Sequence, residues 1–232
     1  MDQFSFRIHE KNILVYRSVF APVKSNMFCI LSGEEAVVFD PNENDEFITL
    51  FERRKIKRVH ILLTHEHYDH TSGVNWLKDK TGADVYCQNN CAEVISTKRG
   101  NNPALVALIL ADQDKQDGGH RYKDFKEVFT PYTIQADKTF DKEDEVVIDN
   151  LFFHVTSTPG HCPGAACYKL FDEMVFTGDT LLQNDPVIIS FRESKKDDYE
   201  RIALPYLRSL PKDTIIMPGH GDPFVLCQTK NI

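Results

Sequence analysis

Thr64-His-Glu-His-Tyr-Asp-His70 places three imidazoles and the Asp69 carboxylate within positions 65–70. The apolar run 58–64 that leads into it has the composition of a buried strand. A strand that ends in four potential ligands delivers them to one edge of a sheet. Imidazole nitrogen and carboxylate oxygen are the donors that hold zinc, or iron in related sites. The stretch therefore predicts a metal site with the candidate ligands His65, His67, Asp69 and His70. The alternative is a polar turn that happens to be rich in histidine.

Alternating apolar runs and turns surround this stretch. Four runs upstream, at residues 4–8, 13–16, 26–31 and 36–39, predict an antiparallel meander of strands. Residues 44–56, 72–80, 91–98 and 199–210 have the spacing or the stop signals of helices. Further strands are predicted at 83–87, 146–148, 151–156, 174–177 and 214–217. This order favours two packed sheets with helices outside, a layered α/β architecture in one domain that spans residues 1–232.

Residues 99–131 interrupt that order. A helix is predicted over 104–111, and the polar run 112–119 is expected to end it. We interpret 99–131 as an insertion on the domain. Long insertions in compact domains are often lids or binding loops, although a surface loop without a role is the alternative.

The composition limits the possible functions. A net charge of −8 argues against a general binder of nucleic acid or of acidic membranes. No apolar run is long enough to span a bilayer, and residues 1–10 lack a secretory signal, so a cytoplasmic protein is expected. The six cysteines form no CxxC pair and are expected to be reduced and mostly buried. The composition leaves the oligomeric state open.

Three further turns each place a candidate ligand just after an apolar strand. They are Thr158-Pro-Gly-His161, Thr177-Gly-Asp-Thr180 and Pro218-Gly-His-Gly221. The glycines let the backbone turn sharply and bring a side chain close to an ion. If these strand ends lie at one edge, His161, Asp179 and His220 converge on the first four ligands.

Together these motifs resemble the metallo-β-lactamase-fold superfamily. The matching residues are His65-x-His67-x-Asp69-His70, Gly160-His161, Gly178-Asp179-Thr180 and Gly219-His220-Gly221. The resemblance implies a four-layer αββα sandwich with a two-metal site at one edge. It also implies one ion held by His65, His67 and His161, a second ion held by Asp69, His70 and His220, and Asp179 as the bridge between them.

Such a site favours hydrolysis of a small-molecule substrate. Water between two divalent ions loses a proton near neutral pH and becomes a hydroxide nucleophile, and the same ions stabilise charge on the substrate oxygen. Asp69 is the candidate catalytic residue, because it is placed to orient the hydroxide or to pass a proton to the leaving group. We expect two divalent ions, zinc first, with iron or manganese as alternatives. No nucleic-acid or membrane partner is expected.

Within the superfamily, the motifs are most similar to those of glyoxalase II-like thioesterases, which implies cleavage of an ester or thioester bond. Residues 181–192 lack the Gly-Arg-x-Asp stretch that often follows in such proteins. Lactonase, phosphodiesterase and mononuclear-iron persulfide dioxygenase-like activities therefore stay open, and so does a non-catalytic binding protein on this fold.

Several other residues lie near the motifs. Arg192, Lys195 and Lys196 are candidates for pairing with a substrate anion, with a solvated charged run as the preferred alternative. Tyr68 either donates a hydrogen bond to an oxyanion or packs in the core, and packing is preferred. Cys162 stands beside His161 but outside the motif, so it is not expected to be a ligand.

Overall fold

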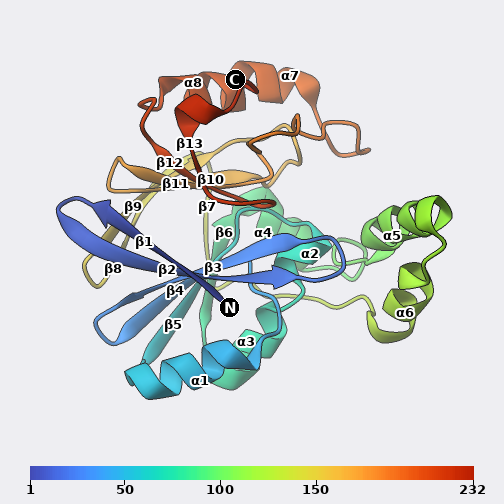
Figure 1. Ribbon diagram of the computed structural model, residues 1–232, viewed down its shortest axis with the longest axis horizontal. Coiled ribbons are helices and arrows are strands. Elements are labelled where there is room, and N and C mark those ends of the chain that lie inside the picture. The colour runs from blue at the N-terminus through green and yellow to red at the C-terminus, as the bar shows by residue number, and fades with distance from the viewer.

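The computed structural model covers residues 1–232 and contains two β-sheets packed face to face (Figure 1). The first sheet has seven strands in the order β1-β2-β3-β4-β5-β6-β7. They are β1 (Asp2–Ile8), β2 (Lys11–Phe20), β3 (Ser25–Ser32), β4 (Glu35–Phe39), β5 (Arg58–Leu62), β6 (Asp84–Gln88) and β7 (Lys138–Phe140). The first four strands pair antiparallel, which confirms the predicted meander. β4 to β7 pair parallel, so the carboxyl ends of β4 and β5 lie side by side.

The second sheet has six strands in the order β13-β12-β11-β10-β9-β8. They are β8 (Glu143–Ile148), β9 (Leu151–Ser157), β10 (Ala166–Leu170), β11 (Met174–Gly178), β12 (Ile215–Pro218) and β13 (Phe224–Val225). β10 is not among the predicted strands, because its alanine and lysine residues are poor strand formers. β11 and β12 pair parallel, so the turns that follow them leave the sheet at the same edge.

One hydrophobic core joins the sheets. Phe39 of β4 stacks on Phe176 of β11 with ring centroids 3.7 Å apart, and Tyr168 of β10 packs edge-on against Phe39. All three side chains are buried. These contacts hold the end of β4 beside β11. The candidate ligands follow β5, which pairs with β4, and the strands β9, β11 and β12 of the second sheet.

Helices cover the two outer faces, which confirms the αββα layering (Figure 1). On the first sheet lie α1 (Asp45–Arg54), α3 (Val74–Thr81) and α4 (Asn89–Ile95), and on the second lie α7 (Lys196–Asp198), a π-helical turn (Tyr199–Ala203) and α8 (Leu204–Ser209). Phe47 and Leu50 of α1 are buried against the first sheet, at the spacing of one helical face. Leu207 of α8 packs on the second sheet in the same way. A short 3₁₀ turn, Leu226–Gln228, follows β13.

The predicted single helix 199–210 is instead divided. The helical run starts before the predicted first residue, with α7 at Lys196. Residues 199–203 then form a π-helical turn, and α8 begins at Leu204. Pro205 has no backbone N–H and cannot bond to the carbonyl four residues before it, which accounts for the wider turn.

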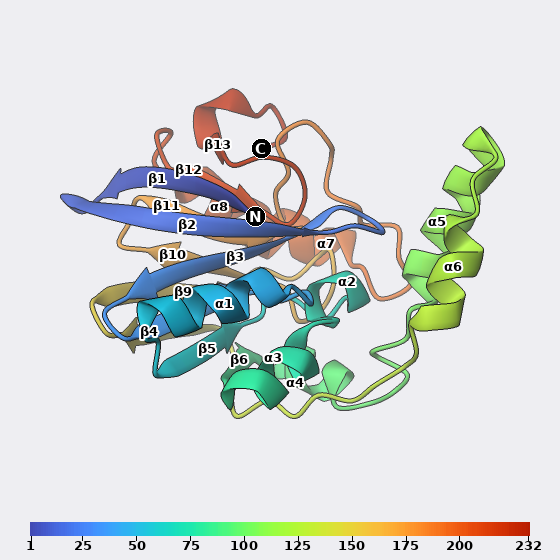
Figure 2. The ribbon, with the colours of Figure 1, turned by 60° about the horizontal axis from the view of Figure 1, so that its bottom comes forward.

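A hairpin of two helices, α5 (Ala104–Asp117) and α6 (Arg121–Val128), extends from one side of the sandwich (Figure 2). The predicted helix end at Ala111 is too early, because α5 continues to Asp117, but the helix does end within the polar run 112–119. Polar residues suit an exposed helix: Gln116 donates to Asp112 one turn earlier, at 3.0 Å. Gly118, in the left-handed region at φ +76°, ends the helix. α5 is the longest helix with 14 residues, and no helix has the length and hydropathy needed to cross a bilayer.

Candidate metal centre

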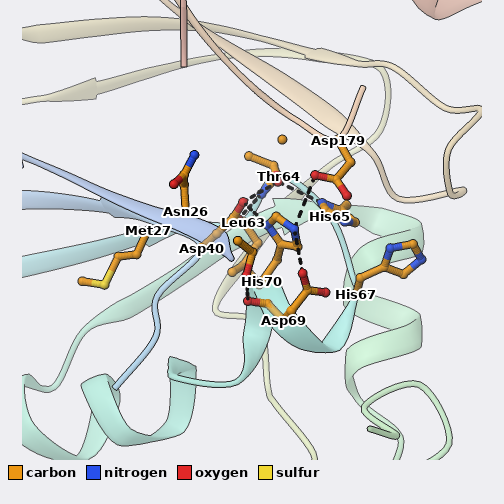
Figure 3. A network of polar contacts seen from close by, with 12 residues as sticks. Asn26, Met27, Asp40, Leu63, Thr64, His65, His67, Asp69, His70 and Asp179 are labelled. Atoms are coloured by element: carbon orange, nitrogen blue, oxygen red, sulfur yellow. Dashed lines mark hydrogen bonds and ion pairs between the residues drawn. The ribbon is translucent and has the colours of Figure 1, made fainter. Parts of the chain in front are cut away.

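The structure brings all seven predicted ligands to one edge of the sandwich. The first two follow β5, the next two lie on α2 (Tyr68–Thr71), and the last three follow β9, β11 and β12. They fall into three overlapping groups whose potential ligand atoms lie within 4.8 Å of one another: His65, His67, His161 and Asp179; Asp69, His70 and His220; and His65 and His70 with Asp40. Figure 3 shows the His70 ring between Asp69 and Asp179. The chain order alone would not place these side chains together, since they come from both sheets.

Hydrogen bonds outside the site fix which nitrogen of His161 faces inward. His161 Nδ1 lies 2.7 Å from the carbonyl oxygen of Ile188, which only accepts, so Nδ1 carries the proton. Nε2 of the neutral ring then presents a lone pair, 3.0 Å from His67 Nδ1. The other nitrogen of His67 lies 3.5 Å from the Glu193 carboxylate, which favours a proton there. Two lone pairs would then face each other, an arrangement that a cation between them stabilises.

Asp40 fixes the other two buried rings. It accepts from the Thr64 backbone N–H at 2.7 Å, from the Thr64 hydroxyl at 2.5 Å and from His70 Nδ1 at 2.9 Å. Because the Thr64 hydroxyl donates to Asp40, its oxygen is left to accept from His65 Nδ1 at 3.0 Å. Nε2 of both His65 and His70 is thereby left unprotonated in the neutral ring and faces the site.

The inward-facing atoms have no hydrogen-bond partner. His65 Nε2, His70 Nε2 and Asp179 Oδ1 are buried and unpartnered, although the last two lie 3.5 Å apart. Unsatisfied buried polar atoms cost about 1–3 kcal/mol each, so a native protein rarely leaves several together without an ion or water. The donor set of imidazole and carboxylate and these orphaned atoms fit a divalent cation such as zinc or iron.

Close backbone packing supports the cluster. Gly219 lies so near Asp179 and His70 that a Cβ atom there would overlap both side chains. Asn26 of β3 donates through Nδ2 to the carbonyls of Pro218, at 2.9 Å, and Gly221, at 2.7 Å, which holds the turn that carries His220. Gly219 and Asn26 together allow the turn after β12 to bring the His220 imidazole against two carboxylates, those of Asp69 and Asp179.

The charges in the cluster divide it into two halves. Burial lowers the pKa of His65 well below its usual range and the pKa of His161 to about 4. Burial also opposes charge on His70 and His220, but neighbouring carboxylates, Asp69 and Asp179 among them, outweigh it and raise these pKa values to about 9 and about 11. In the ion-free protein at pH 7, His65 and His161 are therefore neutral, whereas His70 and His220 are protonated.

This difference predicts unequal proton release when ions bind. A ligand must be unprotonated, so binding at Asp69, His70 and His220 displaces protons at pH 7, whereas His65 and His161 have none to lose. The affinity for the ion held by Asp69, His70 and His220 should therefore rise with pH, until the pH approaches the raised pKa values of the two histidines. Calorimetry of zinc binding in two buffers of different ionisation enthalpy measures the protons released at each step. Equal release at both steps would contradict the assignment.

The cluster opens into a pocket of about 270 Å³ that includes His67, Asp69, His161, Asp179 and His220. One wall comes from α5 and the other from the loop after Asp179. The other lining residues are Val23, Leu105, Val106, Ile109, Gln113, Leu182, Asp185, Pro186, Ile188 and Phe191. A substrate bound here would touch the candidate ligands directly.

The other residues near the motifs lie outside this pocket. Arg192, Lys195 and Lys196 are exposed and do not line it. Tyr68 is buried and packs edge-on against Phe125, in agreement with the preferred interpretation. The Cys162 thiol donates to the buried Glu66 carboxylate at 3.2 Å and stays away from the ring nitrogens.

Sequence reasoning missed the outer partners of the histidines. Asp40 lies just after the predicted strand 36–39 and was not among the candidate residues, and Thr64 was only the start of the motif. The available signal for Asp40 was its position: it directly follows a strand, as the ligands do. No sequence signal identifies the Ile188 carbonyl or Glu193, because both reach the site through the long loop after β11.

An αββα sandwich with histidines and carboxylates gathered at one edge defines a class of metal-binding enzymes. The chain belongs to the metallo-beta-lactamase superfamily, whose family model matches residues 21–220, and it is a metallo-hydrolase. This result confirms the resemblance expected from the motifs.

Known relatives agree with this assignment. The probable metallo-hydrolase YqgX of Bacillus subtilis is 23% identical over 207 residues, which cover 88% of this chain and 89% of the relative. The hydroxyacylglutathione hydrolase GloC of Haemophilus influenzae is 27% identical, with 85% of each chain covered. The crystal structure of the BLEG-1 B3 metallo-beta-lactamase superposes with a TM-score of 0.70 at 26% identity, over 92% of this chain and 95% of that one.

Proposed function

We propose that the protein hydrolyses an ester or thioester bond, in the manner of a glyoxalase II-like thioesterase, with two divalent ions bound at the candidate metal centre. His65, His67 and His161 would hold one ion, Asp69, His70 and His220 the other, and Asp179 both. The observation that carries the proposal is the set of ring nitrogens and carboxylate oxygens that converge at the base of one pocket, where His65 Nε2, His70 Nε2 and Asp179 Oδ1 are buried without hydrogen-bond partners.

The second group favours two ions over one. Asp69 Oδ2 lies 3.4 Å from His70 Nε2 and 3.5 Å from His220 Nε2. Asp179 Oδ2 lies 3.5 Å from both His161 Nε2 and His220 Nε2, between the two groups. In a mononuclear-iron enzyme, this second set of donors would hold no ion.

The side chains have separate tasks in the reaction. A pair of bound divalent ions polarises the substrate carbonyl and supplies a hydroxide nucleophile near neutral pH. Asp69 lies at the pocket surface, and the histidines beside it hold its pKa near 2 against the effect of burial. Its carboxylate is therefore ionised and available to orient the attacking water and to carry its proton toward the leaving group. The apolar walls exclude bulk water from the reacting carbonyl.

The relatives support the reaction class. The 27% identical protein from Haemophilus influenzae is named a hydroxyacylglutathione hydrolase, which is a thioesterase, and it matches over most of both chains. Zinc is the first candidate for the ions, with iron and manganese as alternatives, because imidazole and carboxylate ligands suit all three.

A metal-dependent esterase assay tests the proposal. We expect the purified protein to bind two equivalents of metal and to hydrolyse p-nitrophenyl acetate or an S-acyl thiol ester. Chelation should abolish the activity, and added zinc, iron or manganese should restore it. A folded protein that binds two ions but hydrolyses neither ester nor thioester would overturn the proposal, as would turnover that chelation leaves unchanged.

A further inference from the structure

The pocket above the candidate metal centre contains no lysine or arginine side chain. Its ionised residues other than histidine are three aspartates, Asp69, Asp179 and Asp185. Away from the ligands that would hold the ions, a carboxylate or phosphate in this pocket would lose its water without gaining a lysine or arginine partner, which is costly. The three lysine and arginine residues of the loop 192–196 are exposed outside the pocket.

Apolar side chains form the two walls. Leu105, Val106 and Ile109 come from successive turns of α5, and Ile188 and Phe191 come from the facing loop. The Phe191 ring lies edge-on to His67 and His161, with centroids 5.3 and 5.6 Å away. Ile188 is bonded through its own carbonyl to His161. The apolar wall is therefore attached to the candidate ligands and sits beside any group that reacts there.

The volume limits what the pocket can enclose. At about 270 Å³ it is slightly below the range of about 300–1,000 Å³ that encloses a drug-sized ligand. An acyl group of a few carbons fits, whereas a whole acyl-glutathione does not. The acyl group stays bonded to the reacting carbon throughout, while the leaving group must depart toward solvent. The enclosed part of the substrate is best assigned to the acyl side.

We infer that this pocket selects substrates with an uncharged, apolar acyl group of short to medium length and rejects acyl groups that end in an anion. This inference rests on the proposed ester or thioester hydrolysis. α5 is then the element that sets specificity, and Ile109 is its most exposed apolar contact, with 38% of its surface exposed.

Matched esters test the preference. p-Nitrophenyl butyrate and p-nitrophenyl hemisuccinate share a leaving group and a four-carbon acyl chain, but only the second ends in a carboxylate. We expect kcat/KM to favour the butyrate by about a hundredfold or more, since an unpaired charge is disfavoured in the pocket. From acetate to butyrate, each methylene that becomes buried should raise kcat/KM about fourfold. Equal rates on the matched pair would overturn the inference while leaving the proposed function intact.

Two neighbouring residues of α5 provide a variant and its control. Ile109→Lys places a cation in the pocket and should reduce the butyrate preference by about tenfold or more. Leu108→Lys makes the same change one residue earlier, at a side chain that is 67% exposed and outside the pocket, and should leave the preference unchanged. An unchanged preference in Ile109→Lys, or the same loss in both variants, would contradict the role of this wall.

A binding measurement separates this inference from the proposed function. Saturation-transfer NMR with hexanamide, which resists hydrolysis, reports whether the pocket binds an apolar acyl chain even in metal-free protein. Binding that is lost in Ile109→Lys and kept in Leu108→Lys would support the inference even if no ester were hydrolysed. Adipic acid monoamide, the anionic counterpart, should show no such binding, and binding as strong as that of hexanamide would overturn the inference.

Discussion

Replacing Asp179 with alanine should remove bound metal and activity together. Its carboxylate oxygens lie 3.5 Å from His70, His161 and His220, which belong to both candidate ligand groups. Loss of a partner that merely orients a ligand costs about 10–100-fold in metal affinity or activity, so loss of a bridging ligand should cost more than about 100-fold in kcat/KM. Metal content by mass spectrometry and ester hydrolysis measure the two effects on one sample.

Asp185→Ala is the matched control for this variant. Asp185 lines the same pocket, but it forms no ion pair with any histidine. Its removal should leave two ions bound. If Asp179→Ala still binds two ions with wild-type affinity, the bridging role is wrong, whatever happens to the activity.

The sequence predicted those parts of the fold and site that depend on local pattern. A strand followed by a turn with glycine and a ligand recurs at His161, Asp179 and His220, and the parallel pairs β4–β5 and β11–β12 explain why such ends meet at an edge. Layering could be inferred because apolar runs alternate with helical patterns. The candidate ligands came from the motifs that follow the strands, whereas their division between two ions came from the family resemblance. Their role in binding metal stays a prediction.

Contacts made by long-range packing could not be predicted in the same way. The extent of α5 was underestimated, because a polar helix that projects from the sandwich has little of the apolar periodicity that marks a helix. The residues that form the walls of the pocket could not be identified from the sequence either. Ile109 and Ile188 are 79 positions apart in the chain, and only the tertiary structure brings them onto one pocket with the ligands.

Asp40 is an example of a residue whose contacts with the site could not be predicted from the sequence. A lone aspartate before proline is common at the end of a strand, and nothing in its neighbours indicates a partner 30 residues away. Its side chain is nonetheless only 3% exposed, and every hydrogen bond it accepts leads to a residue of the motif. We therefore expect it to set the tautomer of both His65 and His70.

Asp40→Asn should weaken metal binding by about 10–100-fold without unfolding the protein. Asparagine tolerates the left-handed backbone at this position, where φ is +48°, so the chain path is preserved. The amide, however, turns one acceptor oxygen into a donor. If its NH₂ replaces Oδ2, it faces the Thr64 hydroxyl and His70 Nδ1, both of which donate to the carboxylate. The rings of His65 and His70 then lose the bonds that point their lone pairs inward, and chelator competition would measure the loss.

Glu35→Gln provides the control at the opposite end of the same strand. Glu35 begins β4 and contacts His60 at 2.8 Å, also through a carboxylate and an imidazole, but far from the pocket. Both variants remove one negative charge from the same strand, so a general electrostatic effect would weaken metal binding in both. A loss confined to Asp40→Asn, with thermal unfolding unchanged, would mean that this carboxylate acts by orienting the ligand rings. Unchanged affinity for both ions would instead show that the ions themselves are sufficient to orient the histidines.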